Sequence, residues 1–132
     1  PAQIERGGAM AVAIERGQRP PVLEAGDLDV TRDFTNVSDV LDAYLALAEK
    51  GAGGEVYNVC SGVEYRVRDL VEQMIALTGL PVAITHDPAR FRRAEQARVV
   101  GDNRKLCADT GWAPRVSMAD SLREILDDWR AR

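Results

Sequence analysis

The chain has 132 residues, of which 45% are hydrophobic and 29% are charged, and its formal net charge is −4. This length allows one domain with a core of its own, and the composition is typical of a globular protein and not of a disordered one. The acidic balance disfavours a dedicated nucleic-acid-binding protein, and no apolar run approaches the roughly 20 residues of a membrane-spanning helix. We therefore expect neither a nucleic-acid partner nor a membrane.

The first fifty residues predict two helices. Residues 9–16 are rich in helix-forming residues, and Gly17 is a natural C-terminal stop. A short extended piece at residues 22–23 follows a Pro-rich break. The second helix begins after Asn36 or Thr35, either of which can cap it. Apolar residues recur along this helix at helical spacing and form one face: Val37, Val40, Leu41, Tyr44, Leu45 and Ala48.

The middle of the chain alternates short strands with a helix. Residues 55–60 are mostly apolar and β-branched, which predicts a buried strand. Residues 69–78 predict an amphipathic helix, and residues 82–85 a second strand. Because helices alternate with few and short strands, we expect an α/β fold, in which these strands resemble the edge of a sheet whose other strands are missing.

Two further helices are predicted near the C-terminus. Asp102 can cap a short helix that stops at Gly111. Ser117 can cap the last helix, with Asp120 in the position of the acidic residue of a capping box. The last helix carries an apolar stripe: Met118, Leu122, Ile125, Leu126 and Trp129.

The sequence shows no catalytic machinery of its own. It contains no glycine-rich dinucleotide motif, no Walker A loop, no GxSxG motif and no Tyr-x-x-x-Lys pair. His86 is the single histidine and cannot build a metal site by itself. Cys60 and Cys107 form no CxxC motif, so we interpret them as buried thiols of a cytoplasmic protein. The chain begins with Pro1 in a helical pattern, which we interpret as a piece of something longer.

Arginines at two places could bind an anion. Arg32 stands just before the helix that follows Asn36, where backbone N–H groups also favour negative charge. The alternative is a surface ion pair with Asp33 or Asp29.

The second place is the stretch FRRAEQARVVGD at residues 91–102. Arginine binds phosphate through two parallel hydrogen bonds, and a carboxylate accepts hydrogen bonds from ribose hydroxyls. Arg92 and Arg93 beside Glu95 therefore suit a nucleotide diphosphate, and a solvated ion-paired loop is the alternative.

Three ordered blocks of the chain together resemble a known family. These are RDFTNVSDVLDAYLAL, then GEVYNVCSG, then RRAEQARVVGDNRKLCADTGWAP. They are similar to the C-terminal half of extended short-chain dehydrogenase/reductases acting on nucleotide sugars, most of all the GDP-6-deoxy-4-keto-hexose reductases and GDP-mannose 4,6-dehydratases. The resemblance implies the C-terminal part of a Rossmann-like NAD(P)-binding fold.

The resemblance also implies roles for individual residues. The arginine of the family's R-D-[FYW] motif contacts the substrate diphosphate and corresponds to Arg32. The arginine and the acid of its R-P-x-[DE] motif contact the diphosphate and the ribose, and correspond to Arg92 and Glu95. The segment before R-D-F lies near the base in this family, which makes Leu23 and Glu24 weaker candidates.

The chain departs from the family's pattern in three respects. Arg93 stands where the family usually has proline, and Arg98 stands where an apolar residue is common. The glycine-rich cofactor turn and the Ser/Tyr/Lys catalytic set belong to an N-terminal half that this sequence does not contain.

We therefore expect residues 1–132 to form one substrate-binding portion of an NAD(P)-dependent nucleotide-sugar reductase or dehydratase. It would bind a nucleotide-diphosphate sugar, would bind no cofactor alone and would be inactive alone. The alternatives are the C-terminal portion of a 4-epimerase, or a non-catalytic interaction module. A homodimer, or a separate N-terminal half, would then be the protein partner.

Overall fold

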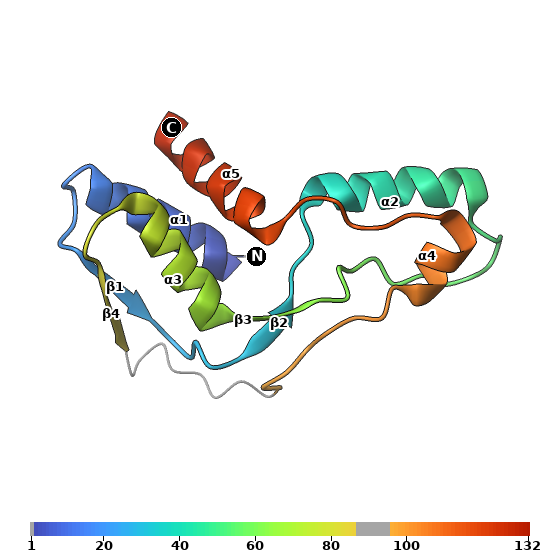
Figure 1. Cartoon of the computed structure of the whole chain (residues 1–132), viewed down its shortest axis with the longest axis horizontal. Helices are drawn as coiled ribbons and strands as arrows, with labels where there is room; N and C mark the ends of the chain where they lie inside the picture. Colours follow the sequence, from blue (N-terminus) through green and yellow to red (C-terminus); the bar gives the residue numbers. More distant parts are fainter. Residues whose placement is uncertain (1, 87–95) are drawn as a thin grey trace.

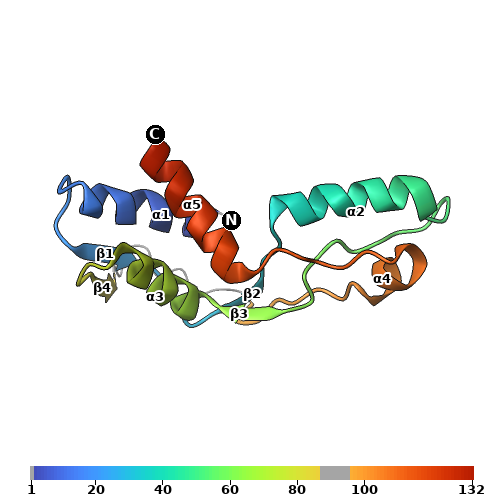
Figure 2. The same cartoon turned by 45° about the horizontal axis from the view of Figure 1, so that its top comes forward.

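A computed structural model describes residues 2–86 and 96–132 and divides them into two lobes joined by a small sheet (Figure 1). The larger lobe contains α1 (Ala2–Glu15), β1 (Val22–Ala25), α3 (Val67–Thr78), β4 (Ala83–His86) and α5 (Met118–Ala131). The smaller lobe contains α2 (Val37–Lys50) and α4 (Arg104–Thr110). Between the lobes, β2 (Thr31–Asp33) pairs antiparallel with β3 (Glu64–Arg66). The turned view shows the same division (Figure 2). The α/β fold class is confirmed.

Capping residues set the ends of α2, α4 and α5 within one residue of where the sequence predicts them, whereas α1 begins at Ala2, seven residues before the predicted start. The Asn36 side chain accepts a hydrogen bond from the backbone N–H of Ser38 at 2.9 Å, and Ser117 Oγ accepts one from Asp120 at 3.1 Å. The α4 helix ends at Gly111, whose φ of 75° is a left-handed conformation that favours glycine. Asp102 lies one residue before the cap of α4, and its Oδ1 accepts from the Arg104 N–H.

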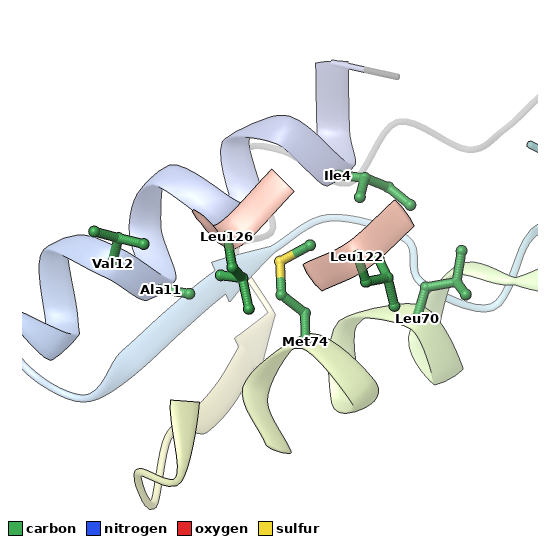
Figure 3. Packing of buried hydrophobic residues seen from close by; sticks show 7 residues of the cluster. All are labelled: Ile4, Ala11, Val12, Leu70, Met74, Leu122 and Leu126. Atoms are coloured by element: carbon green, nitrogen blue, oxygen red, sulfur yellow. The ribbon is translucent and has the colours of Figure 1, made fainter. Parts of the chain in front are cut away.

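Three helices enclose the core of the larger lobe (Figure 3). The apolar face of α1 meets α3 and α5, which come from distant parts of the sequence. The buried side chains of this cluster are Ile4, Ala11, Val12, Leu70, Met74, Leu122 and Leu126. The predicted stripe of the last helix is confirmed, since Leu122 and Leu126 are buried and Met118, Ile125 and Trp129 pack against the cluster. Each Å² of apolar surface removed from water contributes about 25 cal/mol to the stability of the folded state. The burial of these side chains is therefore the main contribution to the stability of the larger lobe.

A parallel strand pair lies beneath these helices. β1 and β4 run parallel, with Leu23 opposite Ile84 and Ala25 opposite His86. Leu23 and Ala25 of β1 belong to a second buried cluster with Leu28, Val30 and Val67, and Ile84 of β4 packs against it. The predicted strand at residues 82–85 is confirmed within one residue, whereas β2 and β3 were not predicted because each has only three residues.

The smaller lobe has a minor core on one side of α2 only. Ala43, Leu106 and Trp112 are buried there. The carboxylate of Asp39 is also buried and accepts hydrogen bonds from the backbone N–H groups of Arg115 and Val116, at 2.9 and 3.1 Å. The buried charge is therefore compensated by two N–H donors. The apolar face identified in the sequence is not the packed side: Val37, Leu41, Tyr44 and Leu45 are 57–70% exposed.

Two predictions are wrong in this lobe. Residues 55–60 form no strand, because no other described strand lies alongside them to provide backbone partners. Cys60 and Cys107 are free thiols, as expected, but both are only partly buried. Partial burial nevertheless raises the pKa of the Cys60 thiol, and the nearby Asp33 carboxylate adds to this effect.

None of the helices in the described parts of the chain is long and apolar enough to span a membrane.

Candidate functional site

Arg32 occupies the centre of β2, at the junction of the two lobes. Its guanidinium donates hydrogen bonds to backbone carbonyls: Nη2 to Gln96 at 3.0 Å, and Nη1 to Thr31 at 2.7 Å and to Ala97 at 3.5 Å. These carbonyls hold the side chain in one orientation. A guanidinium has five N–H donors, so bonds of this kind can fix it while it also binds an anion.

The carboxylates that could have neutralised Arg32 have other partners. Asp29 forms ion pairs with Arg66 and Arg68, and these two side chains hold the pKa of its carboxyl below the ordinary value. Among the ion pairs of the described residues, none involves Arg32. The surface ion pair with Asp29 or Asp33, which the sequence left open, is therefore absent.

Asp33, the next residue of β2, joins three segments of the chain. Its Oδ1 accepts from Ser61 N–H at 2.9 Å and from Ser61 Oγ at 2.6 Å, while Oδ2 accepts from Gly62 at 2.9 Å and Gly101 at 3.1 Å. A Cβ at Gly101 would clash with the side chain of Cys60. Glycine is therefore required at residue 101 for the close approach of this backbone to Cys60. The hydrogen bond from Gly101 to Asp33 keeps the segment after residue 96 beside β2.

Residues 96–100 run along β2 and line an open hollow. The backbone N–H of Thr31 donates to Ala97 at 2.9 Å, and that of Val99 donates to Thr31 at 3.2 Å. The hollow has a volume of about 500 Å³ and is lined by Gln96, Arg98, Val99 and Val100. Its size is in the range of small-molecule sites.

Arg98 has a partner in the structure, although the sequence offered none for it. Its Nε donates to Glu64 Oε2 at 2.7 Å, and the other oxygen of Glu64 accepts from Thr31 Oγ1 at 2.5 Å. The hydroxyl of Thr31, and then Arg98, lower the pKa of the Glu64 carboxyl. Arg98 thus pairs residues 96–100 with β3 while two thirds of its side chain stays exposed beside the hollow.

The predicted site residues fall in different places. Arg92 and Glu95 lie outside the described residues. Leu23 is buried in the cluster between β1 and the helices, and Glu24 is exposed on β1 opposite Thr85. The structure brings Arg32 together with residues 96–98 but does not place Leu23 or Glu24 at the hollow. The roles of these five residues in binding stay predictions.

Sequence reasoning missed the residues that position Arg32. Thr31, Asp33 and Glu64 hold the segments around it through hydrogen bonds of 2.5–3.1 Å. The sequence TRD could have indicated the role of Asp33. If it is read as a strand, successive side chains point to opposite sides, so Asp33 points away from the side of Arg32. In the described part of the chain, no group of three or more His, Cys, Asp or Glu could hold a metal ion.

The fold and this site define a class of protein. The chain superposes with a TM-score of 0.93 on the structure of RMD from Pseudomonas aeruginosa complexed with NADPH, at 43% identity, covering 98% of this chain and 42% of that one. It thus corresponds to a portion of the Rossmann-like short-chain dehydrogenase/reductase fold.

The particular family follows from the sequence comparisons. The GDP-mannose 4,6 dehydratase family matches residues 6–125, and the chain belongs to this family. It is 48% identical over 119 residues to GDP-6-deoxy-D-mannose reductase of Pseudomonas aeruginosa, covering 90% of this chain and 39% of that protein. It is 30% identical over 105 residues to UDP-glucose 4-epimerase of Mycolicibacterium smegmatis, covering 80% of this chain and 33% of that protein. The chain therefore spans about two fifths or less of the length of these relatives.

Proposed function

We propose that this chain is the nucleotide-sugar-binding portion of an NAD(P)-dependent GDP-sugar reductase or dehydratase. The observation that carries the proposal is the guanidinium of Arg32, which backbone carbonyls, among them that of Gln96, hold in one orientation and which pairs with no described carboxylate. Gln96 also lines the open hollow. A fixed guanidinium of this kind can hold a diphosphate through charge-assisted hydrogen bonds. Arg92 and Glu95 would complete the binding of the diphosphate and the ribose, and Leu23 and Glu24 are weaker candidates near the base.

In the complete enzyme, hydride would pass between NAD(P)(H) and a hexose carbon. This sequence has no glycine-rich dinucleotide motif, so we assign cofactor binding to the rest of such an enzyme. The part played by this chain is to bind the nucleotide diphosphate, because binding energy from this remote group can orient the sugar for reaction. Alone, the chain is expected to be catalytically inactive.

The 30% identity to a UDP-glucose 4-epimerase supports a second candidate, the corresponding portion of a 4-epimerase. The two candidates differ in the base of the nucleotide. Titration of the chain with GDP and with UDP separates them: tighter binding of GDP supports the reductase or dehydratase, and tighter binding of UDP supports the epimerase.

Calorimetric titration of GDP into the wild type and into Arg32→Ala tests the proposal. Loss of hydrogen bonds to a charged group costs about 1.5–3 kcal/mol, which weakens binding about 10- to 100-fold. Arg92→Ala and Glu95→Ala should also weaken binding. Arg123→Ala is the matched control, because Arg123 is an exposed arginine of α5 that pairs with Asp120.

Arg32→Lys adds a geometric test, because lysine keeps the charge and loses the planar fork. We expect it to bind more weakly than the wild type and more tightly than Arg32→Ala. Equal affinity of the wild type, Arg32→Ala and Arg92→Ala for GDP would overturn the assignment. Thermal unfolding of each variant shows whether the fold is kept.

A further inference from the structure

Residues 97–99 run parallel to β2, on the edge of β2 that β3 does not occupy. Thr31 forms a parallel bridge with Arg98. The Thr31 N–H donates to the carbonyl of Ala97 at 2.9 Å, and the Val99 N–H donates to the carbonyl of Thr31 at 3.2 Å. Residues that lie opposite each other in neighbouring strands point to the same side, so the side chains of Thr31 and Arg98 share one side of this small sheet.

The carboxylate of Glu64 reaches across β2 on that same side. Glu64 belongs to β3, and its Oε2 accepts a hydrogen bond from Arg98 Nε at 2.7 Å. Its Oε1 accepts one from Thr31 Oγ1 at 2.5 Å. A single carboxylate therefore joins β3, β2 and residues 97–99, and it adds side-chain contacts to the backbone hydrogen bonds of Thr31.

The segment that Glu64 holds also orients the guanidinium of Arg32. Arg32 Nη2 donates to the carbonyl of Gln96 at 3.0 Å, and Nη1 donates to that of Ala97 at 3.5 Å. Successive residues of a strand point to opposite sides, so Arg32 points away from the side of Thr31 and Glu64. Within the described ranges, no hydrogen bond or ion pair joins Glu64 to Arg32. An effect of Glu64 on Arg32 would therefore pass through the backbone of residues 96–98.

We infer that the ion pair of Glu64 with Arg98 positions the anion-binding guanidinium of Arg32, because it keeps in place the two carbonyls that orient this guanidinium. Glu64 and Arg98 are thus positioning residues, and neither contacts the anion. The inference gives a role to Arg98, which stands where the family commonly has an apolar residue. It rests on the proposed function, but the orientation of Arg32 can be measured without a ligand.

The mobility of the Arg32 side chain in the ligand-free chain tests the inference directly. The order parameter of the Arg32 Nε–H bond, measured by NMR relaxation on the isotope-labelled full chain, reports how tightly the guanidinium is held. Arg32→Lys identifies the signal by removing it. We expect the order parameter to fall in Arg98→Ala and in Glu64→Gln. Glu64→Gln keeps the size of the side chain and one carbonyl oxygen for Thr31, but it removes the charge that attracts Arg98.

Calorimetric titration of GDP measures the effect on binding. A partly exposed ion pair contributes modestly, so Glu64→Ala and Arg98→Ala should each weaken GDP binding by about two- to fivefold. Because both variants remove the same contact, the double variant should bind as weakly as either single variant. Glu64→Ala should have no further effect when Arg32 is already alanine. Exchanging the charges, by Glu64→Arg together with Arg98→Glu, should restore the pair and the affinity.

The matched control is Glu15→Ala, since Glu15 also accepts hydrogen bonds from one arginine, Arg130, through both oxygens, but lies in α1. It should change neither the order parameter of Arg32 nor the affinity for GDP. Thermal unfolding shows that each variant keeps its fold.

The inference is overturned if the order parameter of Arg32 is the same in the wild type, Glu64→Gln and Arg98→Ala. It is also overturned if the losses of the two single variants add in the double variant, which would show that Arg98 binds the anion itself. A loss on Glu64→Ala that persists without Arg32 would contradict it as well. If the wild-type chain binds no GDP, the proposed function fails, and the order parameter alone decides the inference.

Discussion

The two lobes differ in how completely their helices are buried and in the contacts that stabilise them. In the larger lobe, three helices and a strand pair surround two clusters of buried apolar side chains, so each helix has its apolar side covered. In the smaller lobe, α2 rests on a cluster of three buried residues, and its other side is exposed. Hydrogen bonds to the carboxylate of Asp39 hold the adjoining segments in place there, and those to Asp33 do the same at the junction of the lobes. The larger lobe is thus stabilised mainly by apolar burial, and the smaller lobe depends more on polar contacts.

This difference teaches that amphipathicity in a sequence identifies an apolar face but not what covers it. The stripe on α5 and the stripe on α2 have the same helical spacing. The first is buried within the chain, whereas the second is solvent-exposed. Three measurements would test the comparison between the lobes.

The largest effect is expected from removing the same side chain in each lobe. Leu126 of α5 is fully buried, so Leu126→Ala removes packing atoms and leaves a cavity, at a cost of about 3 kcal/mol in the free energy of unfolding. Leu45 of α2 is 65% exposed, and Leu45→Ala should change this free energy by less than about 0.5 kcal/mol. Urea unfolding measures both, and similar losses would show that α2 is packed in solution.

A smaller effect is expected at Asp39. Replacing it by alanine leaves two N–H groups, of Arg115 and Val116, without an acceptor, and costs about 2 kcal/mol. Asp39→Asn keeps one carbonyl oxygen and should cost about half as much. The exposed Asp42 of the same helix is the control, since Asp42→Ala should have little effect. A loss no greater than that control would contradict the dependence of this lobe on polar contacts.

The smallest effect concerns an ion pair on the larger lobe. Arg130 donates to both oxygens of Glu15, at 3.0 and 2.5 Å, and lowers the pKa of that carboxyl from 4.5. The contribution is therefore present above about pH 4.5 and is lost as the pH falls through the lowered pKa. Because the pair is partly exposed, Glu15→Gln should cost less than about 1 kcal/mol at pH 7, and the difference from the wild type should shrink as the pH falls through the lowered pKa of Glu15. The exposed Glu49 provides the control substitution, and a cost that does not change with pH would exclude an ionic origin.

The sequence predicts the helices of the fold better than its strands. Ser117 and Gly111 mark helix ends through local chemistry, so these ends are confirmed within a residue or two. The three-residue strands β2 and β3 exist because distant segments meet, and nothing local announces them. The strand expected at residues 55–60 has the right composition, but a strand also needs a neighbour, and composition does not provide one.

At the candidate site, motif and position predicted Arg32 but not its surroundings. An arginine just before a helix cap suggests an anion, and this is visible in the sequence. The carbonyls of Gln96 and Ala97 that fix it are backbone groups 64 and 65 residues away, and side-chain identity carries no information about them. Arg98 is explained by Glu64, which is 34 residues away, so its role also depended on the tertiary fold.

Because α1 packs against α5, the core of the larger lobe is completed only late in the synthesis of these segments. Ile4, Ala11 and Val12 are synthesised more than a hundred residues before Leu122 and Leu126, which pack against them. Arg16 and Glu15 likewise find their partner, Arg130, more than a hundred residues later. Until α5 is made, the apolar side chains of α1 therefore lack part of their cover. Apolar surface exposed in this way during folding promotes aggregation, which the completed cluster removes.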